Sequence, residues 1–170
     1  MATPLFINRT DLVRNSIIDG NVDTNKFIYF INIAQTIHIQ NYLGTDLYQE
    51  FEGMITAGTL TQVTNPNHYN LMVDYIQPML IWFAQVDYIP FAAYQIKNGG
   101  VYKHRSENSE SASKEELDYL VAKAREYAEY YTRRFIDYMN FNNTTFPKYL
   151  SNSNDDIDPS QDALFNGWVL

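Results

Sequence analysis

The segment Asn67–Ile96 constrains the fold more than any other part of the chain. Asp74 and Asp87 are its only acidic residues, and it contains no lysine or arginine. A helix that is apolar on all sides usually lies at the centre of a protein, covered by other elements. Polar residues and a proline interrupt its most apolar part, whereas a membrane-spanning helix needs about 20 largely apolar residues in a row. We therefore expect a buried central helix that kinks or breaks just ahead of Pro78 and Pro90.

Amphipathic helices are predicted on both sides of this segment. One begins at Thr24 and ends at Gly44, and a second runs from Thr45 or Asp46 to Gly58. A capping box of Ser113 and Glu116 starts the last helix. Its apolar stripe comprises Leu117, Leu120, Val121, Ala124, Ala128, Tyr131, Phe135, Tyr138 and Met139. The chain of 170 residues is thus expected to form one all-α domain over residues 1–147, a helical bundle of about four to five helices.

Two segments do not fit the helical pattern. Residues 98–113 predict a long loop or β-finger inserted in the bundle domain, with Tyr102, Lys103, His104 and Arg105 as candidate contacts to a channel or a neighbour. Residues 148–170 predict an acidic tether followed by an apolar docking tail, in which Asp155–Asp158 is solvated. The anchors of this tail are Leu164, Phe165, Trp168, Val169 and Leu170. The alternative is that the tail folds back on its own domain.

The sequence contains few groups that could perform chemistry. Because there is no cysteine, disulfides, thiolate catalysis and cysteine-ligated metals are excluded, and the net charge of −8 disfavours tight binding to nucleic acid. His38 lies on an apolar arc and predicts a hydrogen-bonded core histidine, while His68 and His104 are predicted to face solvent. Phosphate-binding glycine patterns, a nucleophile elbow and a calcium loop are missing. We expect no enzyme activity, cofactor or metal; a metal-dependent enzyme using His38 and His68 is a minor alternative.

Two stretches go beyond general helix chemistry. Pro4–Ile7 and Ile18–Asp23 precede the motif Ala34–Tyr48, and together they resemble the head–tail connector (adaptor or ring) proteins of tailed bacteriophages, particularly crAss-like and related phages of Bacteroidetes. The motif residues are Ala34, Gln35, His38, Ile39, Gln40, Tyr42, Leu43, Gly44, Leu47 and Tyr48. Within them, we expect Gly44 to be a left-handed cap between two helices, and Gln35 and His38 to form a buried polar contact between helices.

The resemblance implies a structural virion protein at the head–tail junction, assembled in the host cytoplasm. Such proteins form a homo-oligomeric ring, commonly twelvefold, between the portal and other connector or tail proteins, without contact with a membrane. DNA passes through the channel without specific binding. The finger would line the channel or reach a neighbour, and the tail would dock on the portal or the next ring. The alternative function is a non-catalytic helical regulatory or binding module that captures a protein partner through its C-terminal tail.

Overall fold

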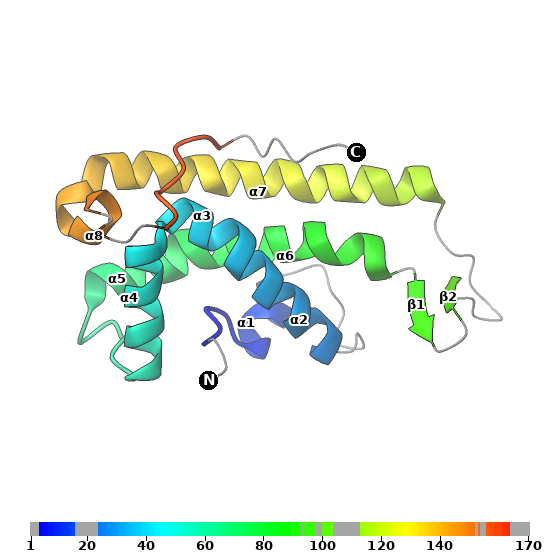
Figure 1. The fold of residues 1–170 in the computed structure, drawn as a ribbon, viewed down its shortest axis with the longest axis horizontal. Coiled ribbons are helices and arrows are strands. Elements are labelled where there is room, and N and C mark those ends of the chain that lie inside the picture. The colour runs from blue at the N-terminus through cyan, green and yellow to red at the C-terminus, as the bar shows by residue number, and fades with distance from the viewer. Residues whose placement is uncertain are drawn as a thin grey trace.

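The computed structural model describes residues 4–15, 24–92, 94–97, 100–103, 113–151, 153 and 156–163. These residues form an all-α bundle with one small hairpin, as the sequence predicts (Figure 1). The longest helix, α7, packs antiparallel against α6, and α2 crosses α6 on its other side. The helices are α1 (Arg9–Asn15), α2 (Thr24–Ala34), η1 (Gln35–Ile39), α3 (Gln40–Leu43), α4 (Thr45–Thr56), α5 (Pro66–Leu71), η2 (Met72–Ile76), α6 (Gln77–Ala92), α7 (Lys114–Asn142), η3 (Asn143–Thr145) and α8 (Pro147–Leu150).

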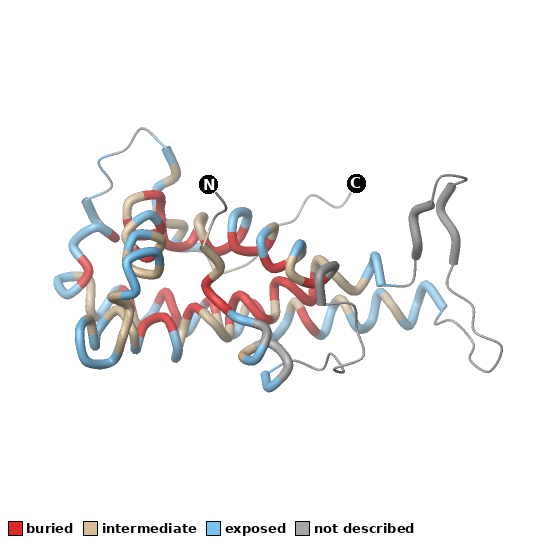
Figure 2. The backbone as a smooth tube through the Cα atoms, turned by 90° about the horizontal axis from the view of Figure 1, so that it is seen from below, coloured by how far each residue is buried: buried red, intermediate tan, exposed pale blue. Residues whose placement is uncertain are grey.

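The apolar segment forms the centre of the bundle, which confirms the prediction. Elements α5, η2 and α6 follow one another without a break from Pro66 to Ala92, and α6 packs against α2, η1 and α7. Among the described residues, no helix is both long and apolar enough to cross a membrane. Figure 2 shows that buried residues gather around this central helix and become fewer towards the hairpin end of the molecule.

The central helix was expected to kink or break near each proline, and it continues past both as three successive helical pieces, α5, η2 and α6. Ahead of Pro78 the helix widens into the π-helix η2, and Pro90 lies within the last turn of α6, where few further backbone bonds can be lost. Proline 78 has no N–H to donate to the carbonyl of Asp74, four residues earlier. The Arg134 side chain supplies a replacement, since its Nη1 donates to that oxygen at 3.3 Å. A π-turn and a neighbouring helix thus accommodate Pro78 without ending the helix.

Helix α7 begins with the predicted capping box. The Ser113 Oγ accepts from the Glu116 N–H at 3.2 Å, and Glu116 Oε2 accepts from the Ser113 N–H at 2.7 Å. The apolar stripe is buried only from Ala124 onwards, because the first turns of α7 extend past the bundle and leave Leu120 43% exposed.

The predicted finger contains a β-hairpin that starts before residue 98. Strand β1 (Tyr94–Lys97) pairs antiparallel with β2 (Gly100–Lys103), with Tyr94 opposite Lys103 and Lys97 opposite Gly100. The sequence between them is Asn98-Gly99, the strongest short-range signal for a two-residue hairpin turn. Residues 104–112 of the predicted finger lie outside the described residues.

Candidate assembly surfaces

Gln35 joins the N-terminal segment to the bundle. Its side chain is fully buried in the π-helix η1, where Oε1 accepts from the Phe6 N–H at 2.8 Å. Its Nε2 donates to the Pro4 carbonyl at 2.9 Å and to the Tyr48 hydroxyl of α4 at 3.1 Å. Gln77 adds a bond from Nε2 to the Phe6 carbonyl at 2.9 Å. The predicted polar contact between helices is confirmed, and it also fixes residues 4–6.

His38 is the predicted core histidine. It is 3% exposed, and its ring stacks on Phe83 with centroids 4.2 Å apart and planes 10° from parallel. Its Nε2 lies 3.3 Å from Asp87 Oδ2, so both of these contacts reach α6. The histidine therefore joins η1 to the central helix.

Gly44 separates α3 from α4 in a conformation that differs from the predicted left-handed cap. Its φ is +73°, as expected, but its ψ of 158° places it in a region that is essentially confined to glycine. A Cβ at this position would lie 2.7 Å from Cδ of Pro159. The reason for the glycine is thus both the backbone and the close approach of a proline from the C-terminal segment.

The C-terminal segment 156–163 is bound at this junction. The Thr45 N–H donates to the Ile157 carbonyl at 3.0 Å, and the Thr45 hydroxyl donates to Asp156 Oδ2 at 2.8 Å. The Ser160 N–H donates to the Asn41 carbonyl at 2.9 Å. Asp156 was predicted to be solvated. Instead it accepts a hydrogen bond at the N-terminus of α4, where a carboxylate is favoured.

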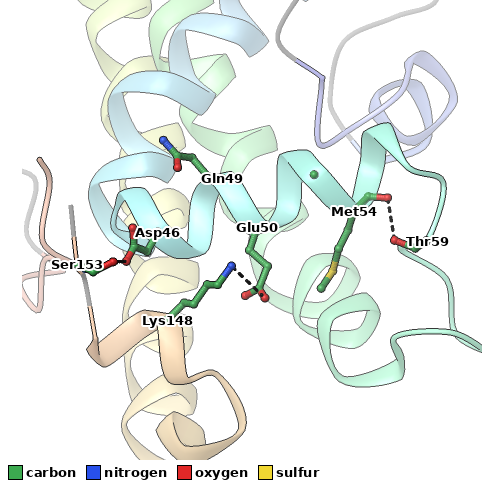
Figure 3. A pocket seen from close by; sticks show the side chains of 8 residues that line it. Asp46, Gln49, Glu50, Met54, Thr59, Lys148 and Ser153 are labelled. Carbon is green, nitrogen blue, oxygen red and sulfur yellow. Dashed lines mark hydrogen bonds and ion pairs between the residues drawn. The ribbon is translucent and has the colours of Figure 1, made fainter.

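A polar groove on α4 receives the chain from α8 onwards (Figure 3). Asp46 Oδ2 accepts from the N–H and hydroxyl of Ser153 at 2.7 and 2.9 Å, and Glu50 Oε1 lies 3.5 Å from Lys148 Nζ. The lining residues are Asp46, Gln49, Glu50, Gly53, Met54, Thr59, Lys148 and Ser153. Both carboxylates in this groove thus bind the chain's own residues on either side of position 150.

His68 lies beside this groove. It was predicted to face solvent, and this prediction was wrong. Its side chain is 17% exposed, and its Nε2 lies 3.4 Å from Glu50 Oε2. Its ring meets Phe51 and Phe146 with centroids 5.6 and 5.1 Å away. The sequence places it next to Pro66 in a first helical turn, and only the packing of α4 against the chain near α8 covers it.

An exposed aromatic surface lies where α2 and the end of α6 meet; we call Tyr29, Phe30, Tyr88 and Phe91 the hairpin-end patch. Phe30 contacts each of the other three rings, with centroids 5.4 to 5.5 Å apart. Tyr29 is 62% exposed and Phe91 57% exposed. Sequence reasoning missed this patch. Its signal was Tyr29, an aromatic residue beside the apolar arc of its helix rather than on it.

The predicted site residues fall into three groups. The motif residues other than Gln40 are buried, and Gln40 is half-buried, so the motif is internal. Tyr102 and Lys103 lie on β2, opposite Gln95 and Tyr94. His104, Arg105 and the five tail anchors, Leu164, Phe165, Trp168, Val169 and Leu170, lie outside the described residues. Within the described ranges, no three histidine or acidic residues gather as metal ligands.

Comparison with known proteins gives one result. No curated protein and no solved structure matches the chain. A model of a family of unknown function, DUF6712, matches residues 39–158, more than two thirds of the chain. The matched span includes Gly44, and it includes Thr45 together with Asp156 and Ile157, which Thr45 binds across the fold. The chain therefore belongs to the family of unknown function DUF6712.

Proposed function

We propose that the protein is a structural subunit of the head–tail connector of a tailed bacteriophage. It assembles as a homo-oligomeric ring that joins the portal to the tail and forms part of the DNA channel. The hairpin-end patch is the observation that carries the proposal. Tyr29 and Phe91 expose more than half of their surface beside two further rings, and aromatic residues are enriched where proteins meet. A neighbouring subunit would cover this patch.

The buried motif supports the same proposal. Ala34–Tyr48 carries the resemblance to connector proteins, and here its Gln35 and Thr45 hold the two end segments of the described chain to the bundle. These roles are structural. They require bulk, hydrogen bonding and a glycine at position 44, and they use no side chain as a reactive group.

The charge of the chain fits a channel for DNA. A net charge of −8 repels phosphate and keeps DNA from adhering while it moves. We therefore propose that DNA passes through the ring without specific contacts to it.

The test is assembly with and without the cognate portal. We expect light scattering to show oligomers that grow with protein concentration, and negative-stain images to show added density on portal rings. In the double variant Tyr29→Ser/Phe91→Ser, the apparent affinity of self-association and of binding to portal rings should fall at least tenfold, because the patch loses its apolar area. The matched control is Val63→Ser, since Val63 is 92% exposed and lies away from the patch on the loop after α4.

Two results would overturn the proposal. One is a protein that stays monomeric at high concentration and ignores portal rings. The other is a single tight partner of different identity whose binding needs residues 164–170 and not the patch, which is the behaviour of a binding module.

A further inference from the structure

A second groove, on the other side of α4, has no occupant among the described residues. It lies between the N-terminal segment, the end of α4 and η2, and its volume of about 450 Å³ is in the range of pockets that bury ligands, roughly 300–1,000 Å³. Its half-buried or exposed apolar side chains are Leu5, Met54, Ile55, Leu60, Tyr69 and Val73. Phe6 and Met72 are buried at its base. Asn8, Asp11 and Gln77 also line the groove, so it offers both apolar and polar surface to a segment that binds there.

Side-chain hydrogen bonds hold the N-terminal wall of the groove in place. Residues 4–6 have no helix or strand of their own, and Gln35 holds their backbone at Pro4 and Phe6. Gln77 binds the Phe6 carbonyl from the central helix. Two buried or half-buried glutamines thus position the N-terminal segment as one side of the groove.

The chain itself contains a segment of matching chemistry. Residues 164–170, Leu-Phe-Asn-Gly-Trp-Val-Leu, carry five large apolar side chains and no charged side chain. The residues just before them are fixed: Pro159 packs against Gly44, Ser160 binds Asn41, and the Gln161 side chain donates to the Tyr149 hydroxyl at 2.7 Å. The apolar segment therefore starts from a defined place on the bundle.

That place lies on the opposite side of the bundle from the groove. In Figure 1 the segment up to residue 163 runs over α7, whereas the N-terminal segment and α1 lie beyond α6. Seven residues span at most about 25 Å. Two helices, each about 10–12 Å across with side chains, already account for most of that reach. The segment would be used up before its aromatic anchors reached the groove of its own subunit.

We propose that residues 164–170 of one subunit lie in the groove of a neighbouring copy, against its Leu60, Tyr69 and Val73. This contact joins two different surfaces, so its repetition generates a closed ring when the rotation per subunit closes. The inference rests on the proposed ring and names which surfaces meet in it. Both Gln35 and Thr45 then support this contact. Gln35 positions the N-terminal wall of the groove, and Thr45 binds the chain just before the segment that fills it.

Cross-linking tests the neighbour directly, since the chain has no cysteine of its own. Two single variants, Val169→Cys and Leu60→Cys, are mixed with portal and oxidised. We expect a disulfide-linked dimer containing one copy of each variant. Asn140→Cys, at an exposed position of α7, replaces Leu60→Cys in the control and should give no dimer above background.

Two outcomes of this experiment contradict the inference and leave the proposed function intact. Rings that form without cross-links show that the segment binds elsewhere. A chain that carries both Val169→Cys and Leu60→Cys and closes an internal disulfide at high dilution shows that each subunit fills its own groove.

A peptide assay separates the contact from ring formation. Protein truncated after Ala163 is titrated with a dye-labelled peptide of residues 161–170, and binding is followed by fluorescence anisotropy. We expect saturable binding that Val73→Glu weakens at least tenfold, because the glutamate places a charge at an apolar rim. Val63→Glu is the matched control outside the groove. Binding in a protein that never forms rings would refute the proposed function alone, and no binding would overturn the inference.

Discussion

Gly44 carries two constraints that any side chain would violate. Its φ of +73° with ψ of 158° is costly for other residues, and a Cβ would lie 2.7 Å from Pro159. We expect Gly44→Ala to lower the free energy of unfolding by about 3 kcal/mol, as the sum of backbone strain of about 1–3 kcal/mol and displacement of the proline. Urea denaturation followed by circular dichroism measures this loss.

Two other glycines serve as controls for this substitution. Gly58 also has a positive φ, of +68°, but a Cβ there meets nothing within 4 Å, so Gly58→Ala should cost only about 1 kcal/mol. Gly53 is exposed within α4, and Gly53→Ala should stabilise the protein by about 0.5–1 kcal/mol. If Gly44→Ala cost no more than Gly58→Ala, Pro159 could not be packed against this position.

Gln35 is the second residue whose loss should be large. The variant Gln35→Leu leaves the Phe6 N–H and the Pro4 carbonyl without their side-chain partner, and it removes one hydrogen bond from the Tyr48 hydroxyl, which also binds Thr36. We expect it to lower the free energy of unfolding by about 3 kcal/mol, since each buried group left unsatisfied costs about 1–3 kcal/mol. Tyr48→Phe removes one of the three bonds and should cost about 1 kcal/mol. Equal losses in the two variants would contradict the role of Gln35 in holding residues 4–6.

Tyr42 should make the protein sensitive to alkaline pH. Burial, with smaller contributions from Asp162 and Glu129, raises the pKa of Tyr42 from 10.0 to about 12. Between these values the folded state keeps a proton that the unfolded state has lost, so the free energy of unfolding falls as the pH rises from 10 to 12. Tyr42→Phe should make this fall shallower, as measured by urea denaturation at pH 8 and pH 11. An identical pH dependence in both proteins would contradict the raised pKa of Tyr42.

At the scale of elements, the described N- and C-terminal segments depend on the helices that the motif forms. Thr45→Val removes the hydroxyl that donates to Asp156 and that accepts from the Ile157 N–H at 3.3 Å. We expect amide hydrogen exchange at Ile157 to become about fivefold faster, because a lost hydrogen bond is worth about 1 kcal/mol. Exchange in α6 should not change. Ser151→Ala, which removes only a local bond to the Pro147 carbonyl, is the matched control.

Local signals predicted most elements and failed where two elements act on each other. The capping box at Ser113, the helix ends around Gly44 and the apolar central helix all follow from residues that are neighbours in sequence. Pro78 was predicted to kink or break its helix because proline lacks an N–H. The helix continues because η2 widens there and Arg134 of α7 binds the carbonyl that proline leaves unpaired. That compensation comes from a residue 60 positions away, so no local rule contains it.

For the molecule as a whole, the described part of the predicted tail region, residues 148–151, 153 and 156–163, behaves as part of the bundle. Tyr149 is buried, α8 packs on α4, and Thr45 binds residues 156 and 157. A chain truncated after Ala163 should therefore melt at the temperature of the full chain. Truncation after Pro147 should lower the melting temperature by about 10 °C or more, since a loss of 1 kcal/mol moves it about 2–4 °C in a chain of this size. Equal melting temperatures would show that residues 148–163 contribute no stability. Differential scanning calorimetry measures both.

The site could be predicted from the sequence only in part. Gln35, His38 and Gly44 were identified as structural residues of the motif, because a polar residue on an apolar arc needs a partner and a glycine after a helix indicates a positive φ. The residues that Gln35 binds, Pro4 and Phe6, and the residue packed against Gly44, Pro159, were not identified. The Thr45–Asp156 bond joins residues 111 positions apart, and neither residue type indicates the other. The hairpin-end patch was missed for a similar reason, because exposure at the end of α6 depends on where α2 stops covering it.

The sequence by itself determined that the chain is an all-α bundle around one apolar helix, because helical periodicity, caps and glycines act over a few residues. The tertiary structure alone decided that η1 and the start of α4 hold both the N-terminal segment and the C-terminal segment 156–163. It also decided that, among the described residues, a partly apolar groove and an aromatic patch remain uncovered. These features arise where distant segments pack together, and the free energy of such packing depends on geometry that no local pattern encodes.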